Sequence, residues 1–133
     1  FIIADVMEGK EYQYLELIKC DISTGLDRGS SVSLVLTING EEFSGNGIGN
    51  GGFDAFMDAI TQILTKIGFI MPALKDYEVH IPRGGKTDAL TECIITWQSE
   101  EQEFKTRGVD SNQVMAAVKA TTRMVNMQMH AKS

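Results

Sequence analysis

The sequence has few cysteines, few positive charges and no long apolar run, and each of these absences excludes a class of protein. Its two cysteines, Cys20 and Cys93, stand alone in alternating apolar stretches, which favours buried thiols of a cytosolic protein over a disulfide or a metal pair. With 12 Lys and Arg against 18 Asp and Glu, the net charge is −6, and no basic stripe is present to neutralise nucleic-acid phosphates. No apolar run is long enough to span a membrane. No Cys, His or carboxylate side chains have the spacing of metal ligands.

The length and composition predict a globular protein of one domain. A chain of 133 residues with 43% hydrophobic and 23% charged residues is large enough to bury a core of its own. It starts at Phe1 with neither Met nor a signal peptide, so residues 1–11 are expected to be the remnant of an upstream linker or helix. The domain itself is expected to cover residues 12–133.

The most informative feature present in the sequence is an internal repeat with a spacing of 61 residues. Residues 32–64 align with residues 93–125 without a gap. The matching positions are Leu34 and Ile95, Leu36 and Trp97, Phe43 and Phe104, Gly47 and Gly108, Ile48 and Val109, Ala55 and Ala116, Ala59 and Ala120, and Leu64 and Val125. A unit used twice predicts pseudo-twofold symmetry and a seam between the copies, where a small ligand can bind.

Each copy is expected to contain three strands followed by a helix. In the first copy, alternation predicts strands over residues 12–21, 31–38 and 41–48, with a loop from Ser23 to Gly29 and a tight turn at Asn39-Gly40. An apolar stripe from Phe53 to Ile67 predicts a helix that Gly68 ends.

The second copy follows the same plan. It has a strand over residues 75–82, the turn RGGKTD, a hairpin of residues 89–98 and 102–109, and a helix capped by Asp110 or Ser111. The predicted fold is α+β, with duplicated βββα units, about residues 12–68 and 74–128, and antiparallel sheets that carry their helices on one face.

Three stretches invite a chemical interpretation. The glycine run SGNGIGNGG resembles a phosphate-binding loop, but it precedes the only helix of an antiparallel unit, so a nucleotide site is not predicted. Its helix start still offers backbone N–H groups that can hold a carboxylate. Neither cysteine forms a recognisable nucleophile–base pair with His80, and an enzyme is not expected. The segment IPRGGKTDAL is either plain turn chemistry or part of a site.

At GNGGFDAF, KDYEVH, GGKTDAL and RGVDSNQV the chain resembles the C-terminal regulatory domain of 2-isopropylmalate synthase and (R)-citramalate synthase. The resemblance covers about residues 12–128. It implies a feedback module that forms a homodimer and binds leucine or isoleucine, and that controls a catalytic barrel domain of the same polypeptide. That barrel would use a divalent metal and acetyl-CoA. The module itself would have no activity and no cofactor.

The resemblance also implies where the effector binds. The matching positions are Asn50, Gly51, Phe53, Asp54, Leu74, Tyr77, Ile81, Thr87, Ala89, Val109, Asp110, Ser111 and Gln113. Backbone N–H groups at Gly51 and near Ser111 would suit the carboxylate, and Asp54 the ammonium. Three apolar or aromatic positions, Leu74, Tyr77 and Ile81, would surround the side chain, although their spacings of three and four place them on one side of a strand only loosely.

Two departures and two alternatives accompany this interpretation. Many family members carry Pro where this chain has Gly52, and several carry Pro at Ser111, so both helix starts are less rigid here. We expect leucine to be the effector. The alternatives are an isoleucine-binding domain of a citramalate synthase and a purely structural dimerisation module.

Overall fold

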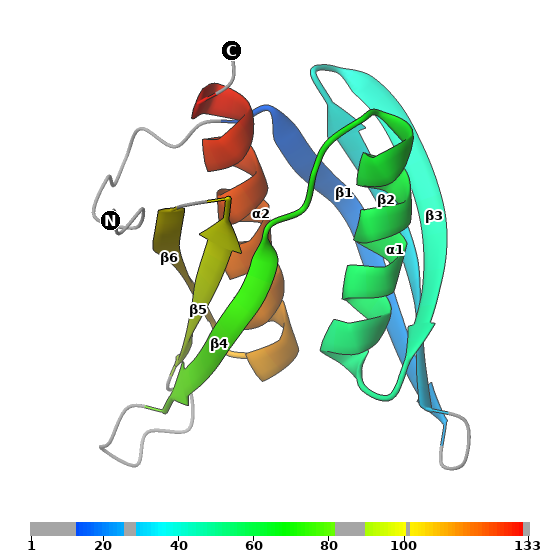
Figure 1. Ribbon diagram of the computed structural model, residues 1–133. Coiled ribbons are helices and arrows are strands. Elements are labelled where there is room, and N and C mark those ends of the chain that lie inside the picture. Colours follow the sequence, from blue (N-terminus) through cyan, green and yellow to red (C-terminus); the bar gives the residue numbers. More distant parts are fainter. Residues whose placement is uncertain (1–12, 26–28, 82–89, 101, 132–133) are drawn as a thin grey trace. The chain divides into compact units, whose positions relative to one another are not determined.

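The computed structural model describes residues 13–25, 29–81, 90–100 and 102–131. Within these ranges the chain forms two compact units, one from Tyr14 to Met71 and another that includes everything from Pro72 onward. Each unit is a three-stranded antiparallel sheet followed by a helix, which confirms the duplicated βββα fold (Figure 1). None of the described helices is long and apolar enough to cross a membrane.

The first unit contains β1 (Leu15–Gly25), β2 (Gly29–Ile38), β3 (Glu41–Gly49) and α1 (Gly52–Lys66), with the sheet order β1-β2-β3. The loop predicted from Ser23 to Gly29 was too long, because both strands continue into it, and its residues 26–28 lie outside the described residues. Ser23 pairs with Ser31 and Thr24 with Ser30. The hydroxyl groups of Thr24 and Ser30 lie 3.0 Å apart in a hydrogen bond, so residues that are typical of loops form a polar cross-strand pair here.

Two local predictions in the first unit are confirmed. Asn39 and Gly40 both have positive φ, 52° and 86°, as a two-residue hairpin turn of type I′ requires. Gly68 has a φ of 83° and follows the end of α1. Its N–H donates to the carbonyl of Thr65 at 3.1 Å, and the next N–H, from Phe69, donates to that of Leu64 at 3.0 Å. This pair of bonds is the Schellman motif that ends a helix at glycine.

The second unit contains β4 (Ala73–His80), β5 (Thr91–Ser99), β6 (Gln102–Asp110) and α2 (Gln113–Ala131), with the sheet order β4-β5-β6. The predicted cap of its helix was wrong by one or two residues. Asp110 still pairs with Thr91 in the sheet. The residue that caps α2 is Asn112, whose side-chain oxygen accepts the N–H of Met115 at 3.0 Å.

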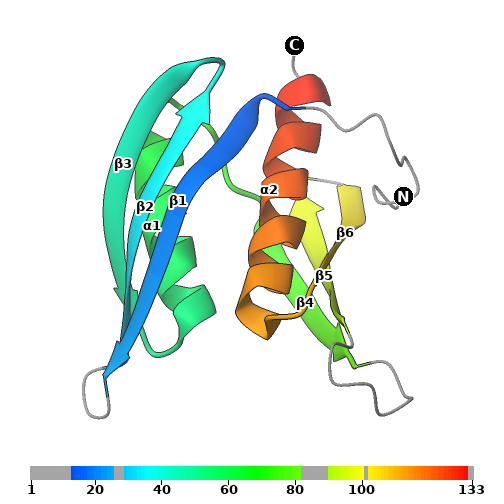
Figure 2. The ribbon, with the colours of Figure 1, turned by 180° about the vertical axis from the view of Figure 1, so that it is seen from behind.

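Each helix covers one face of its own sheet, as both views show (Figure 1; Figure 2). The buried apolar side chains include Val32, Leu34, Leu36, Phe56, Ile60 and Leu64 in the first unit, and Cys93, Ile95, Trp97, Phe104, Val118 and Val125 in the second. Both cysteines are free. Cys93 is buried as expected, whereas Cys20 is only half-buried because it lies on the edge strand β1. Burial raises the pKa of both thiols.

The repeat extends to the contact between strand and helix. A Cβ atom on Gly47 would lie 2.5 Å from the backbone nitrogen of Ala59, and one on Gly108 would lie 2.6 Å from that of Ala120. Both glycines, and both alanines, are 61 positions apart. Glycine is therefore required in each copy so that the helix can lie directly on the third strand.

The first strands of the two copies also correspond, with a different spacing. β1 has a bulge between Leu17 and Lys19, where Leu17 pairs with Leu36. β4 has a bulge between Leu74 and Asp76, where Leu74 pairs with Trp97. Because Leu36 and Trp97 are equivalent positions, the two bulges are equivalent too, at a spacing of 57 residues. The four-residue difference explains why an alignment without gaps does not include these strands.

Candidate functional site

The start of α1 leaves its backbone N–H groups without a side-chain cap. Gly51 is the N-cap residue in an extended conformation, and its carbonyl accepts the N–H of Ala55 at 3.0 Å. Asp54 lies exposed in the first helical turn, and within the described residues no partner is found for its carboxylate. The neighbouring Asn50 is exposed, and Phe53 stacks on Phe56 with ring centroids 6.3 Å apart. This helix start can accept an anionic group.

The start of α2 is occupied by the chain's own side chains. Asp110 accepts the N–H of Asn112 at 2.8 Å through one oxygen, and its other oxygen lies 2.9 Å from the ammonium of Lys119. The hydrogen bond from Asn112, followed by the contact with Lys119, lowers the pKa of Asp110. Ser111 and Gln113 are exposed. The two helix starts therefore differ in chemistry.

The bulge in β4 changes how the predicted apolar residues are arranged. In a regular strand, positions three apart point to opposite faces. The bulge adds one residue between Leu74 and Asp76, so that Leu74 pairs with Trp97 and Tyr77 pairs with Ile95. Trp97 and Ile95 are both buried under α2, so Leu74 and Tyr77 belong to the same face. Tyr77 is half-buried, whereas Leu74 remains 42% exposed.

A depression of about 350 Å³ in the second unit contains two of the predicted residues, Ile81 and Val109. Its other lining residues are His80, Leu90, Glu92 and Arg107. Ile81 is 69% exposed and Leu90 50% exposed, so the depression has an apolar rim. Thr87 and Ala89, which were also predicted, lie outside the described residues.

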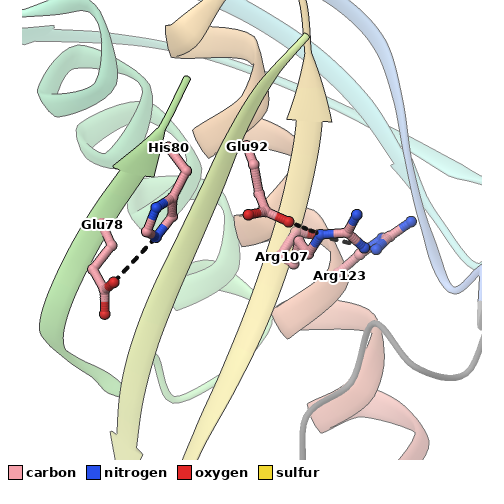
Figure 3. Close-up of polar contacts among 5 residues, drawn as sticks. All are labelled: Glu78, His80, Glu92, Arg107 and Arg123. Atoms are coloured by element: carbon pink, nitrogen blue, oxygen red, sulfur yellow. Dashed lines mark hydrogen bonds and ion pairs between the residues drawn. The ribbon is translucent and has the colours of Figure 1, made fainter. Parts of the chain in front are cut away.

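Figure 3 shows two of the polar contacts on this sheet, between Arg107 and Glu92 and between His80 and Glu78. The Arg107 Nε–H donates to the carboxylate of Glu92 on the neighbouring strand, with both side chains about two-thirds buried, at 34% and 31% exposure. The imidazole of His80 lies 3.2 Å from the carboxylate of Glu78. Sequence reasoning did not single out Glu92 or Arg107. Their signal was a charged residue within the apolar strand of residues 91–97, diagonally across from a basic residue on the next strand.

No group that could hold a metal is found within the described ranges, where three or more His, Cys, Asp or Glu side chains nowhere gather. The described residues offer groups that can bind a small ligand: a helix start for a carboxylate, carboxylates for an ammonium, and apolar side chains.

Comparison with known proteins covers nearly the whole chain. Residues 1–129 match the family described as the LeuA allosteric (dimerisation) domain. The chain is 32% identical over 126 residues to a protein of Methanopyrus kandleri assigned as a 2-isopropylmalate synthase, which covers 94% of this chain and 24% of that protein. It is 30% identical over 125 residues to a protein of Methanoculleus marisnigri assigned as an (R)-citramalate synthase, covering 93% of this chain and 24% of that protein.

A third relative is the 2-isopropylmalate synthase of Aquifex aeolicus, at 27% identity over 125 residues, which covers 94% of this chain and 23% of that protein. The chain thus spans about a quarter of the length of the relatives it matches. The match over residues 1–129, together with a fold of two βββα units, shows that the chain belongs to the LeuA allosteric (dimerisation) domain family.

Proposed function

We propose that this chain is a feedback-regulatory domain that binds a branched-chain amino acid, with leucine favoured, and that forms a homodimer. The observation that carries the proposal is the family match over residues 1–129. The domain would control a separate catalytic domain of the same polypeptide, which condenses acetyl-CoA with a 2-oxo acid at a divalent metal. The names of two relatives as 2-isopropylmalate synthases support this activity for the parent protein.

The effector site is proposed to use the helix starts and the apolar residues of the second unit. At α1, the uncapped N–H groups beyond Gly51 are assigned to the effector carboxylate, and the exposed carboxylate of Asp54 to its ammonium. Two observations support an apolar part in the second unit. The bulge places Leu74 and Tyr77 on one face of β4, and Ile81 lines a depression together with Val109.

The other positions that the family resemblance assigns to the effector site are Asn50, Phe53, Thr87 and Ala89. The second helix start contributes Asp110, Ser111 and Gln113. Because Asp110 is already bound to Asn112 and Lys119, its proposed role is to hold the start of α2 in shape, and the ligand contacts are assigned to the exposed Ser111 and Gln113.

Isoleucine is the second candidate effector, because one relative is named as a citramalate synthase. Leucine and isoleucine differ only in where the side chain branches, and a pocket distinguishes such shapes by about 1–3 kcal/mol. The parent protein would then make citramalate.

Calorimetric titration of this chain with leucine and with isoleucine tests the proposal. A ligand that binds only the folded state stabilises it by about 2.7 kcal/mol at a hundredfold excess over Kd, so a rise in the unfolding temperature is expected as well. D-leucine is the matched control, because it has the same apolar side chain and charges but the wrong geometry. Asp54→Asn should weaken leucine binding, whereas Asp76→Asn on β4 removes the same charge outside the proposed site.

Sedimentation analysis of the same samples separates the remaining alternatives. A dimer that binds leucine or isoleucine agrees with the proposal. A dimer that responds to no branched-chain amino acid would instead identify a purely structural dimerisation module.

A further inference from the structure

Side chains from the two helices bind the outer edges of β3 and β6 at positions that are equivalent in the repeat. On α1, the Asp58 carboxylate accepts a hydrogen bond from the N–H of Ile48 in β3 at 3.0 Å. On α2, the ammonium of Lys119 donates to the carbonyl of Val109 in β6 at 3.2 Å. Asp58 and Lys119 are 61 residues apart, as are their two backbone partners. The same contact is therefore built twice, with opposite charge.

The edge of β6 carries a second contact of this kind. Arg123, one turn after Lys119 on α2, donates to the carbonyl of Arg107 at 3.0 Å, and Figure 3 shows it reaching from the helix to this strand. Lys119 itself lies 2.9 Å from the carboxylate of Asp110 and is held over the edge. Two carbonyl groups on the same side of β6 thus bind cations of α2. The position equivalent to Arg123 on α1 is Gln62.

These backbone groups are the ones that an additional strand would need. β3 and β6 are each one of the two outer strands of their sheet, the other outer strands being β1 and β4. In an antiparallel strand the N–H and the C=O of one residue point to the same side. The N–H of Ile48 and the C=O groups of Arg107 and Val109, which bind helix side chains, therefore point outward from the edge, away from the neighbouring strand. An outer strand with free groups is a template for pairing with another chain, and Ile48 is 75% exposed, which adds an apolar side chain at that edge.

We propose that Asp58, Lys119 and Arg123 close the outer edges of β3 and β6 to strand addition, so that copies of this chain associate through a surface other than these two edges. The inference depends on the proposed dimerisation in one respect only, which is the statement that a second copy binds through another surface. The closure of the edges is a property of each unit by itself. A charged group placed on an edge is a known means of preventing open-ended pairing of strands.

Sedimentation velocity over a range of concentrations tests this closure. The variants are Asp58→Ala, which opens β3, and Lys119→Ala with Arg123→Ala, which opens β6. Alanine is the best helix former, so both helices are expected to persist. The control for the loss of positive charge is Lys66→Ala, at an exposed position in the last turn of α1 and on no strand. Gln62→Ala is the control on α1.

The edge variants are expected to form species larger than the wild type, with an average mass that is about twofold higher or more and rises with concentration. Thioflavin T fluorescence should increase with it, because added strands extend a sheet. The control variants should keep the size of the wild type.

Edge variants that stay folded and keep the size of the wild type would overturn the inference. Circular dichroism and the fluorescence of Trp97, the single tryptophan, report folding. If the double variant does not fold, the single substitutions Lys119→Ala and Arg123→Ala provide the same test. The mass of the wild type tests the proposed dimerisation, and the comparison with the edge variants tests the closure of the edges. Either proposal can therefore be refuted without the other.

Discussion

At the scale of single residues, both copies require a glycine where the helix packs directly on the third strand. Gly47 and Gly108 have no side chain because the backbone of the helix occupies the space where a Cβ would lie. Elsewhere the same residue positions diverge. Trp97 donates to Thr106 at 2.9 Å, and Thr106 donates to the carbonyl of Ala120 at 2.7 Å, so the second core contains a buried polar chain. The first core has Leu36, Gly45 and Ala59 at these positions, none of which carries a polar side chain.

Replacing Gly108 by alanine should destabilise the protein by about 1–3 kcal/mol, because the new methyl group would lie 2.6 Å from the backbone nitrogen of Ala120 and force α2 away from β6. Chemical denaturation measures the loss. The control is Gly51→Ala, where no atom lies within 4 Å of the added Cβ and where only the weaker N-capping of Ala matters, so a smaller loss of about 0.5–1 kcal/mol is expected. Equal losses in both variants would contradict the close-contact argument.

Asp110 should make the stability depend on pH in the acid range. Its pKa in the folded state lies below the ordinary value of 3.8, first because of the N–H of Asn112 and then because of Lys119. The folded state therefore holds this proton less tightly than the unfolded state does. The stabilisation is complete above about pH 4 and is lost as the pH falls through the lower folded value.

Urea unfolding at a series of pH values from about 6 to 3 measures this dependence. Asp110→Asn cannot titrate, so its stability should fall less steeply over the same interval. If the two slopes are the same, the interactions of Asp110 do not favour its ionised form.

At the scale of the elements, the local signals were sufficient where one residue type decides the geometry. Asn39-Gly40 supplies the positive φ values of a hairpin, and Gly68 supplies that of a helix end. Where two neighbouring residues were equally good helix caps, the sequence prediction was wrong. Asp110 and Ser111 are both good helix caps, but Asp110 is held in β6 by its pairing with Thr91, so the helix begins after Asn112.

Asn112→Ala should therefore cost about 1 kcal/mol, because the N–H of Met115 loses its acceptor at the start of α2. Ser111→Ala, at an exposed position one residue earlier, is the matched control and should change the free energy of unfolding by no more than about 0.5 kcal/mol. Urea denaturation of both variants measures the difference. A larger loss of unfolding free energy in Ser111→Ala than in Asn112→Ala would show that Ser111 caps the helix, as the sequence suggested.

At the scale of the whole molecule, the candidate site could be predicted only in part. Its positions came from the family resemblance, and the structure brings Ile81 and Val109 to one depression, together with Glu92 and Arg107, which were not among the predicted site residues. The spacing of Leu74 and Tyr77 left their common face uncertain until the bulge in β4 resolved it. A bulge depends on how two strands pair, and a single strand's sequence does not contain that information.

If folding is coupled to the proposed dimerisation, the unfolding temperature should rise with the concentration of the chain. Two folded copies then form from two unfolded ones, and mass action favours the folded state at high concentration. Differential scanning calorimetry over a hundredfold range of concentration would measure the shift, with leucine absent. A constant unfolding temperature would mean that each copy folds without the other.

The sequence by itself determined the order of two βββα units, the tight turn at Asn39-Gly40 and the helix end at Gly68, because these depend on local backbone preferences and on the period of apolar residues. Only the tertiary structure decided the cap at Asn112, the shared face of Leu74 and Tyr77, and the contacts of Asp58 and Lys119 with the sheet edges. These features require groups from different elements to meet, and which groups meet is set by strand pairing and by the packing of each helix on its sheet.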